Sequence, residues 1–158
     1  MTRHPALALL AGLVLWSGAA LAHSYKLGNL VIGHPWTRAT PPSAPAGGGY
    51  LTVTNNGTTP DKLVSARTPA AGAVQVHEMK MEGNVMRMRE REGGLEIPPG
   101  ATVTFAPGGL HLMMMGLKMP LNQDEKVPVT LVFEKAGSID VEFLVQALGS
   151  PAPGHEHK

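Results

Sequence analysis

Short runs of alternating apolar and polar residues fill most of this chain, and no stretch shows a sustained helical stripe with caps at both ends. The runs are separated by glycine, proline and asparagine, which favour turns. Nine strands are predicted, over residues 26–32, 49–54, 62–66, 74–81, 85–91, 102–106, 110–115, 127–134 and 139–146. Residues 41–48 are expected to form a loop, and Trp36 and Phe133 to lie in the core. Many short strands with turn signals between them favour an all-β sandwich or barrel.

The first 22 residues differ from the rest and are typical of a signal peptide. Arg3 supplies a short basic region, residues 6–15 are almost entirely apolar, and Ala20-Leu21-Ala22 resembles a cleavage site. A membrane anchor is the alternative, although the apolar stretch is near the lower length limit for crossing a bilayer. We therefore expect a signal peptide at 1–22, one domain at 23–148, a flexible tail at 149–158 and a periplasmic location.

Charge and cysteine content exclude several classes of function. Without Arg3 the chain has 12 Lys and Arg against 12 Asp and Glu, which gives no basic field for nucleic acid or anionic lipid. The absence of cysteine excludes disulfides, a lipid attached through cysteine and a Cys-ligated blue-copper centre. Motifs of serine hydrolases, P-loop proteins and zinc peptidases are also missing. We expect a binding protein rather than an enzyme, with no nucleic-acid partner and no stable membrane anchor.

Methionine is unevenly distributed, since eight of the nine methionines lie between Met79 and Met119. Gly83-Asn84 predicts a two-residue hairpin loop between the strands at 74–81 and 85–91. In that register Met79 faces Met88 and Met81 faces Met86. Alternation then places five side chains on one face: His77, Met79, Met81, Met86 and Met88. The other face starts with Val74 and Val76, expected in the core, and continues with charged residues.

A second group of the same residue types occupies positions 110–115. Alternation assigns Leu110, Leu112 and Met114 to the core and leaves His111, Met113 and Met115 for the surface. The two groups can meet only through the fold. Thioether sulfur is a soft donor and imidazole an intermediate one, so a site that combines them selects Cu(I) over harder ions.

The methionines also admit roles that involve no metal. They could fill an irregular core, which suits Met114 and Met119 better than the hairpin, or form an adaptable protein-binding surface. If they do bind metal, Met79, Met81, Met86 and Met115 are alternative ligands that would help to hand copper on. His23, and the tail histidines His155 and His157, are candidates for a second, weaker Cu(II) site.

The ligand pattern resembles the signature of the PCu(A)C-type periplasmic copper chaperones. In that signature a His is followed after ten residues by a Met and, after about 21 more, by His-x-Met; here the pairs are His77 with Met88 and His111 with Met113, across a gap of 22 residues. The additional residue is expected in a loop such as Glu92-Gly93-Gly94. Further similar segments at 36–42, 49–55, 111–117 and 127–134 extend the resemblance over roughly residues 30–145.

This resemblance implies a cupredoxin-like Greek-key β-sandwich, as a single domain, with Cu(I) bound by His77, Met88, His111 and Met113. It also implies delivery of Cu(I) by ligand exchange toward the CuA centre of cytochrome c oxidase. The copper-site subunit of the oxidase and Sco-type proteins would be the partners, and we expect the protein to be a monomer. A periplasmic copper-sequestering or resistance protein is the alternative, followed by a metal-free, methionine-rich interaction module.

Overall fold

The computed structural model describes residues 24–151, and its regular secondary structure there is entirely β-strand. The strands are β1 (Ser24–Leu27), β2 (Leu30–Arg38), β3 (Ala46–Asn55), β4 (Asp61–Arg67), β5 (Ala71–Glu82), β6 (Val85–Glu90), β7 (Leu95–Ile97), β8 (Thr102–Phe105), β9 (Leu110–Leu117), β10 (Lys126–Phe133) and β11 (Gly137–Gln146). The predicted all-β class is confirmed. Across residues 24–151 no helix has the length and apolar character needed to cross a membrane. The predicted signal peptide, His23, His155 and His157 lie outside the described residues.

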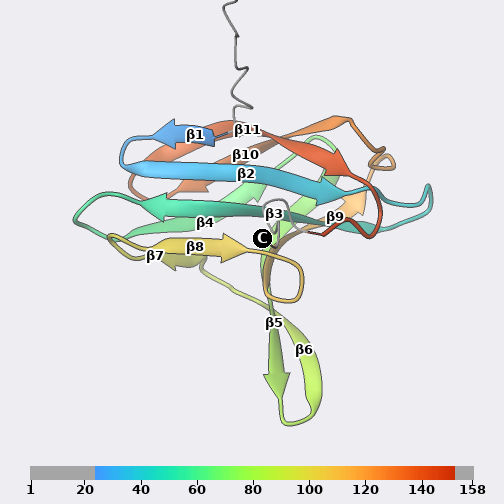
Figure 1. Cartoon of the computed structure of the whole chain (residues 1–158), viewed down its shortest axis with the longest axis horizontal. Helices are drawn as coiled ribbons and strands as arrows, with labels where there is room; N and C mark the ends of the chain where they lie inside the picture. The colour runs from blue at the N-terminus through green and yellow to red at the C-terminus, as the bar shows by residue number, and fades with distance from the viewer. Residues whose placement is uncertain (1–23, 152–158) are drawn as a thin grey trace, which may run out of the picture.

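Strand pairing closes the sheet on itself into a barrel-like wall (Figure 1). Hydrogen-bonded neighbours follow the order β2-β11-β10-β4-β5-β9-β3, and β3 pairs back with β2. Each of the remaining four strands pairs with one strand of this ring: β1 with β2, β8 with β3, β7 with β4 and β6 with β5. Because β3 and β4 follow each other in the chain but are not neighbours in the ring, their link is a crossover rather than a hairpin.

Period-two alternation separates the core from the surface. Every second residue of β3 is buried, and β10 and much of β11 follow the same pattern, which is that of strands with one face against the core. Trp36 and Phe133 are buried as predicted, and Met114 is a fully buried core residue. Met119 was a candidate for the core, but it follows the end of β9 and is exposed.

The segment predicted as one strand at 26–32 is two strands. Gly28 takes a φ of +57°, a left-handed value that suits glycine, and forms with Asn29 a two-residue loop. Leu27 therefore pairs with Leu30, and β1 folds back on β2 as a hairpin. The predicted boundary was wrong because the alternation continues across the loop.

The structure differs from the predicted strands in two other places. The loop expected at 41–48 is shorter, since β3 begins at Ala46 and its first residues pair with β9. The three-residue strand β7 is missing from the prediction because three residues are too few to show alternation.

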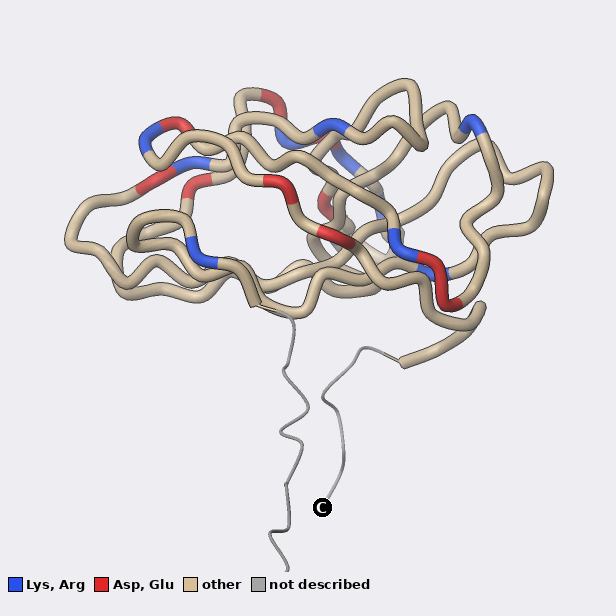
Figure 2. Tube along the Cα trace, turned by 90° about the horizontal axis from the view of Figure 1, so that it is seen from above, with Lys and Arg blue, Asp and Glu red and all other residues tan. Residues whose placement is uncertain are grey.

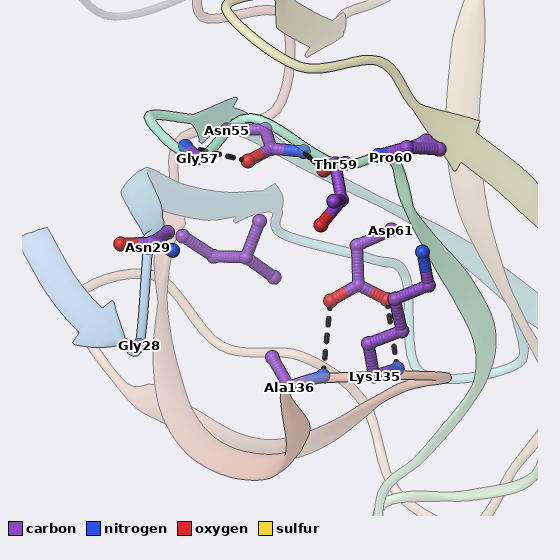
Figure 3. A pocket seen from close by; sticks show the side chains of 10 residues that line it. Gly28, Asn29, Asn55, Gly57, Thr59, Pro60, Asp61, Lys135 and Ala136 are labelled. Atoms are coloured by element: carbon purple, nitrogen blue, oxygen red, sulfur yellow. Dashed lines mark hydrogen bonds between the residues drawn. The ribbon is translucent and has the colours of Figure 1, made fainter.

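A buried carboxylate ties the start of β4 to the turn between β10 and β11 (Figure 3). Asp61 Oδ1 accepts hydrogen bonds from the backbone N–H groups of Lys62, at 2.7 Å, and Lys135, at 2.9 Å. Its Oδ2 accepts one from the N–H of Ala136 at 3.0 Å. The carboxylate lines a hollow of about 220 Å³. A buried charge is tolerated only when it is well hydrogen-bonded, and the three bonds meet that need. The two from Lys135 and Ala136 also hold the turn in place.

We predict that Asp61→Asn destabilises the protein by about 2–4 kcal/mol, since the amide nitrogen would face a backbone donor and leave it unpaired. Urea denaturation followed by circular dichroism measures the loss. The matched control is Asp140→Asn on β11, whose exposed carboxylate accepts a hydroxyl bond from Thr130 and should matter much less. Equal losses in the two variants would contradict the role given to Asp61.

Candidate metal centre

Three adjacent strands carry the predicted ligands, with β5 in the middle. β9 pairs with the first part of β5, from Ala71 to Glu78, and β6 pairs with the second part, from His77 to Glu82. The far half of the β5–β6 hairpin projects away from the barrel (Figure 1). The predicted register is confirmed, because Met79 pairs with Met88 and Met81 with Met86 around a Gly83-Asn84 loop.

The outer face of these strands holds the histidines and methionines in consecutive cross-strand rows. In order toward the hairpin tip, the rows are Met113–Gln75, His111–His77–Glu90, Met79–Met88 and Met81–Met86. Neighbouring rows are two residues apart, or about 7 Å along the strands. The inner face carries Val76, Leu112 and Met114 into the core, as predicted. The fold thus brings both sequence groups onto one surface.

His77 and His111 are direct cross-strand partners, and their ring centroids lie 5.7 Å apart in an edge-to-face arrangement. His111 Nδ1 lies 3.0 Å from the carbonyl oxygen of Gly109, which can only accept, so Nδ1 carries the proton. His77 Nε2 lies 2.8 Å from Gln75 Oε1, an amide oxygen that also accepts. The proton-free nitrogens, His77 Nδ1 and His111 Nε2, are both buried and without a hydrogen-bond partner.

Such an arrangement is typical of imidazoles prepared for a metal ion. Ligating histidines usually donate their second ring N–H to a carbonyl or carboxylate, which fixes the tautomer and the ring orientation. Here the carbonyl oxygen of Gly109 accepts from His111, and the amide oxygen of Gln75 accepts from His77. Neither was singled out from the sequence, although alternation already places Gln75 on the face of His77.

Burial of His111 differs from the prediction. His111 was expected at the surface, but only 5% of it is exposed, and the ring of His77 lies beside it. Burial is also the main cause that lowers the pKa of His77 below the usual 6.5, and the neighbouring His111 lowers it further, against the opposing effect of Glu90. Both effects favour the neutral imidazole, which is the form that binds a metal.

Met88 and Met113 flank the histidine pair from opposite sides. Met88 lies diagonally from His77 on β6, as predicted, and is 48% exposed. Met113 lies two residues from His111 on β9 and is half-buried. Met79 shares the row of Met88 and follows His77 on β5, so a third thioether borders the pair. The donors available are therefore two nitrogens and several sulfurs.

Harder ions find no comparable site among residues 24–151, where no group of three or more His, Asp or Glu side chains could hold a metal. Zinc sites are built from Cys, His and carboxylate, and calcium sites from oxygen. A pair of imidazoles among thioethers suits a soft, monovalent ion instead.

The face of the hairpin opposite the methionines is ionic. Glu82 pairs with Arg87, at 3.2 Å, and with Arg89, and Glu78 pairs with Arg91 at 3.0 Å. Elsewhere on the described chain, positive and negative residues are interspersed (Figure 2). The two faces of the β5–β6 hairpin, a two-stranded ribbon, thus differ in chemistry: one carries thioethers and the other carries salt bridges.

Solved structures similar to this one are PCuAC domains. The fold matches "Copper-bound PCuAC domain from PmoF2" with a TM-score of 0.69 and 30% identity, over 80% of this chain and 99% of that one. The apo PCuAC domain from PmoF1 gives 0.68 and 31%, over 80% of this chain and all of that one. The Cu(I) form of DR1885 from Deinococcus radiodurans gives 0.56 and 31%, over 80% and 83%. These matches confirm the cupredoxin-like β fold and make the chain a homologue of PCuAC domains.

A family model assigns the chain more narrowly. The LpqE-like family matches residues 30–145, and the chain belongs to this family. A curated relative, "Putative lipoprotein Lxx21020" of Leifsonia xyli subsp. xyli, is 36% identical over 111 residues, or 70% of this chain. The match spans 66% of that relative's own length. The present sequence contains no cysteine, the residue through which lipoproteins carry their lipid.

The lowered pKa of His77 predicts a pH dependence of stability in the metal-free protein. As the pH falls below about 6.5, the unfolded chain takes up a proton at this position before the folded chain does, so the free energy of unfolding decreases until the folded pKa is reached. His77→Gln should therefore lose stability less steeply than wild type between about pH 7.5 and 5.5. Denaturation curves at several pH values test this, with His34→Gln on β2 as the control. Parallel slopes for His77→Gln and wild type would contradict the prediction.

Proposed function

We propose that this chain is an exported copper-binding protein that holds Cu(I) between His77 and His111, with Met88 and Met113 completing the site, and passes the ion to another protein. The observation that carries the proposal is the pair of buried, unpartnered nitrogens, His77 Nδ1 and His111 Nε2, on rings 5.7 Å apart. Metal–imidazole bonds are about 2 Å long, so one ion between these rings would use both lone pairs.

Ligand softness supports Cu(I) as the ion. The nitrogens are flanked by thioethers, which favour Cu(I) and disfavour Cu(II). Neutral thioethers also do not titrate, and without cysteine the ligands cannot be lost to disulfides. The copper named in the descriptions of the PmoF2 domain and DR1885 agrees with this choice.

Delivery is supported by the unequal burial of the donors. His111 is buried and His77 is half-buried, whereas Met88 is 48% exposed at the edge of the site. An acceptor can displace Met88 first, forming its own bond to Cu(I) as that thioether leaves, while the histidines still hold the ion. We propose the CuA centre of cytochrome c oxidase as the destination, together with Sco-type proteins, and a periplasmic location reached through the signal peptide at 1–22. No catalytic role is proposed.

A competition titration tests the site. Purified protein is titrated with Cu(I) against a chromogenic chelator, and His111→Ala should weaken binding by more than the roughly 10–100-fold that loss of an outer-shell partner causes. Met113→Leu keeps the volume and should weaken it less. The controls are His34→Ala and Met119→Leu, which change the same residue types away from the cluster. Unchanged affinity in His111→Ala would refute the proposed centre.

Sequestration is the second candidate function, since the same ligands would serve it. A chaperone loaded with Cu(I) should metallate an apo CuA subunit faster than chelated Cu(I) at the same free concentration, because the ion passes within a complex. Absorbance of the CuA centre follows the reaction, and Met88→Leu, which removes the first thioether to leave, should change the transfer rate more than the affinity. Transfer limited by spontaneous release of copper would favour sequestration.

A further inference from the structure

The hairpin beyond the histidine pair carries more thioethers than that site can use. Met79, Met81 and Met86, together with Met88, form two adjacent cross-strand pairs on one face. Their rows continue outward from the histidine row, and the Met81–Met86 row lies four residues, or about 13 Å, from it. One ion between the histidines cannot also be bound by that row.

Packing does not explain these methionines. Met81 is 59% exposed and Met86 is 45% exposed, and all six residues of β6 are exposed. Past Glu78 the pairing of β9 with β5 ends, and β6 is the strand that remains beside β5 (Figure 1). Exposed apolar side chains add little to stability because they remain in water. Charged residues at these positions would make both faces of the hairpin soluble.

The ribbon is instead held together from its other side. The ion pairs of Glu82 with Arg87 and Arg89 lie on the face opposite the thioethers. Each such exposed pair contributes little to stability alone, but together they link the strands without using the methionine face. The thioethers are thus left free for a ligand.

The geometry points to a second Cu(I) site formed by the thioethers of Met79, Met81 and Met86. Directly opposed residues have Cβ atoms about 4.5–5.5 Å apart, and diagonal neighbours are within reach of long side chains. Three flexible thioethers can therefore converge on one ion in a trigonal arrangement. Thioether sulfur selects a soft ion, and the sequence offers no cysteine to compete for it. The inference rests on the proposed function for the identity of the ion, not for the site itself.

The second site would connect with the first through Met79 and Met88. Both lie in the row between the histidines and the Met81–Met86 pair. The centre of the thioether group lies about 10 Å from the histidine row, or one and a half row spacings. Cu(I) can cross this interval by ligand exchange, in which each new Cu–S bond forms as another Cu–ligand bond breaks and the ion keeps its oxidation state.

Stoichiometry tests the second site. Under anaerobic competition, wild type should bind two Cu(I) per chain, and the triple variant Met79→Leu/Met81→Leu/Met86→Leu should lose one of them. Leucine keeps the volume of methionine on a surface outside the core, so the fold should persist, as circular dichroism can check. Met119→Leu is the matched control and should still bind two. A triple variant that binds as many ions as wild type overturns the inference.

A measurement on wild type tests the second site without relying on the triple methionine variant. The protein is labelled with ¹³C at the methionine methyl groups and titrated with Ag(I), a redox-inert soft ion. The Met81 and Met86 methyl signals should shift during the second equivalent, and should still shift in His77→Ala/His111→Ala. If they stay fixed through two equivalents, the inference fails. If the histidine variant instead binds as many ions as wild type, the proposed function fails, so the two failures are distinct.

Discussion

The register between β5 and β9 is the constraint on which the proposed metal centre depends. It sets His77 opposite His111, and it is fixed from the other side of the sheet, where Leu112 and Met114 are each only 1% exposed. A slip of one residue would turn these core side chains outward and bring His111 and Met113 into the core. Each buried Leu or Met contributes about 1.5–3 kcal/mol, so the core excludes the slipped register by several kcal/mol. The hydrophobic core therefore determines which nitrogens meet.

Local sequence signals were enough to predict one half of the centre. Gly83 takes a φ of +62°, the value that a type II′ turn requires at its first central residue, and this loop sets every pair from Glu82–Val85 down to His77–Glu90. The other half, β9, is about thirty residues further on, and alternation within it says which side chains share a face but not which strand lies beside it. Resemblance to a known signature supplied that link. No local pattern could supply it, because long-range pairing depends on how the whole barrel closes.

The burial of His111 and the hydrogen bonds that orient both histidines could also not be predicted from the sequence. Alternation separates two faces of a strand, but it does not say whether neighbouring side chains cover the outer one, and His111 was therefore misplaced at the surface. The unpartnered ring nitrogens also destabilise the metal-free protein, because each buried acceptor without a hydrogen-bond partner costs about 1–3 kcal/mol. Two such nitrogens lie side by side here. A cation bound at the proposed centre would satisfy both at once, so part of its binding free energy would be the removal of a cost that the fold already carries.

The part of the β5–β6 hairpin that leaves the barrel differs chemically from the histidine pair at its base. A two-stranded hairpin is marginally stable alone, and this one is held by ion pairs on one face while four thioethers lie on the other. Thioethers bind without releasing protons, whereas the imidazoles at the base bind in competition with protonation. An ion at the tip would thus be held independently of pH, whereas an ion at the base would be held less tightly as the pH falls below the lowered pKa of His77. If the proposed function and the second site hold, the distribution of copper between base and tip would therefore depend on pH, because only the base competes with protons for the ion.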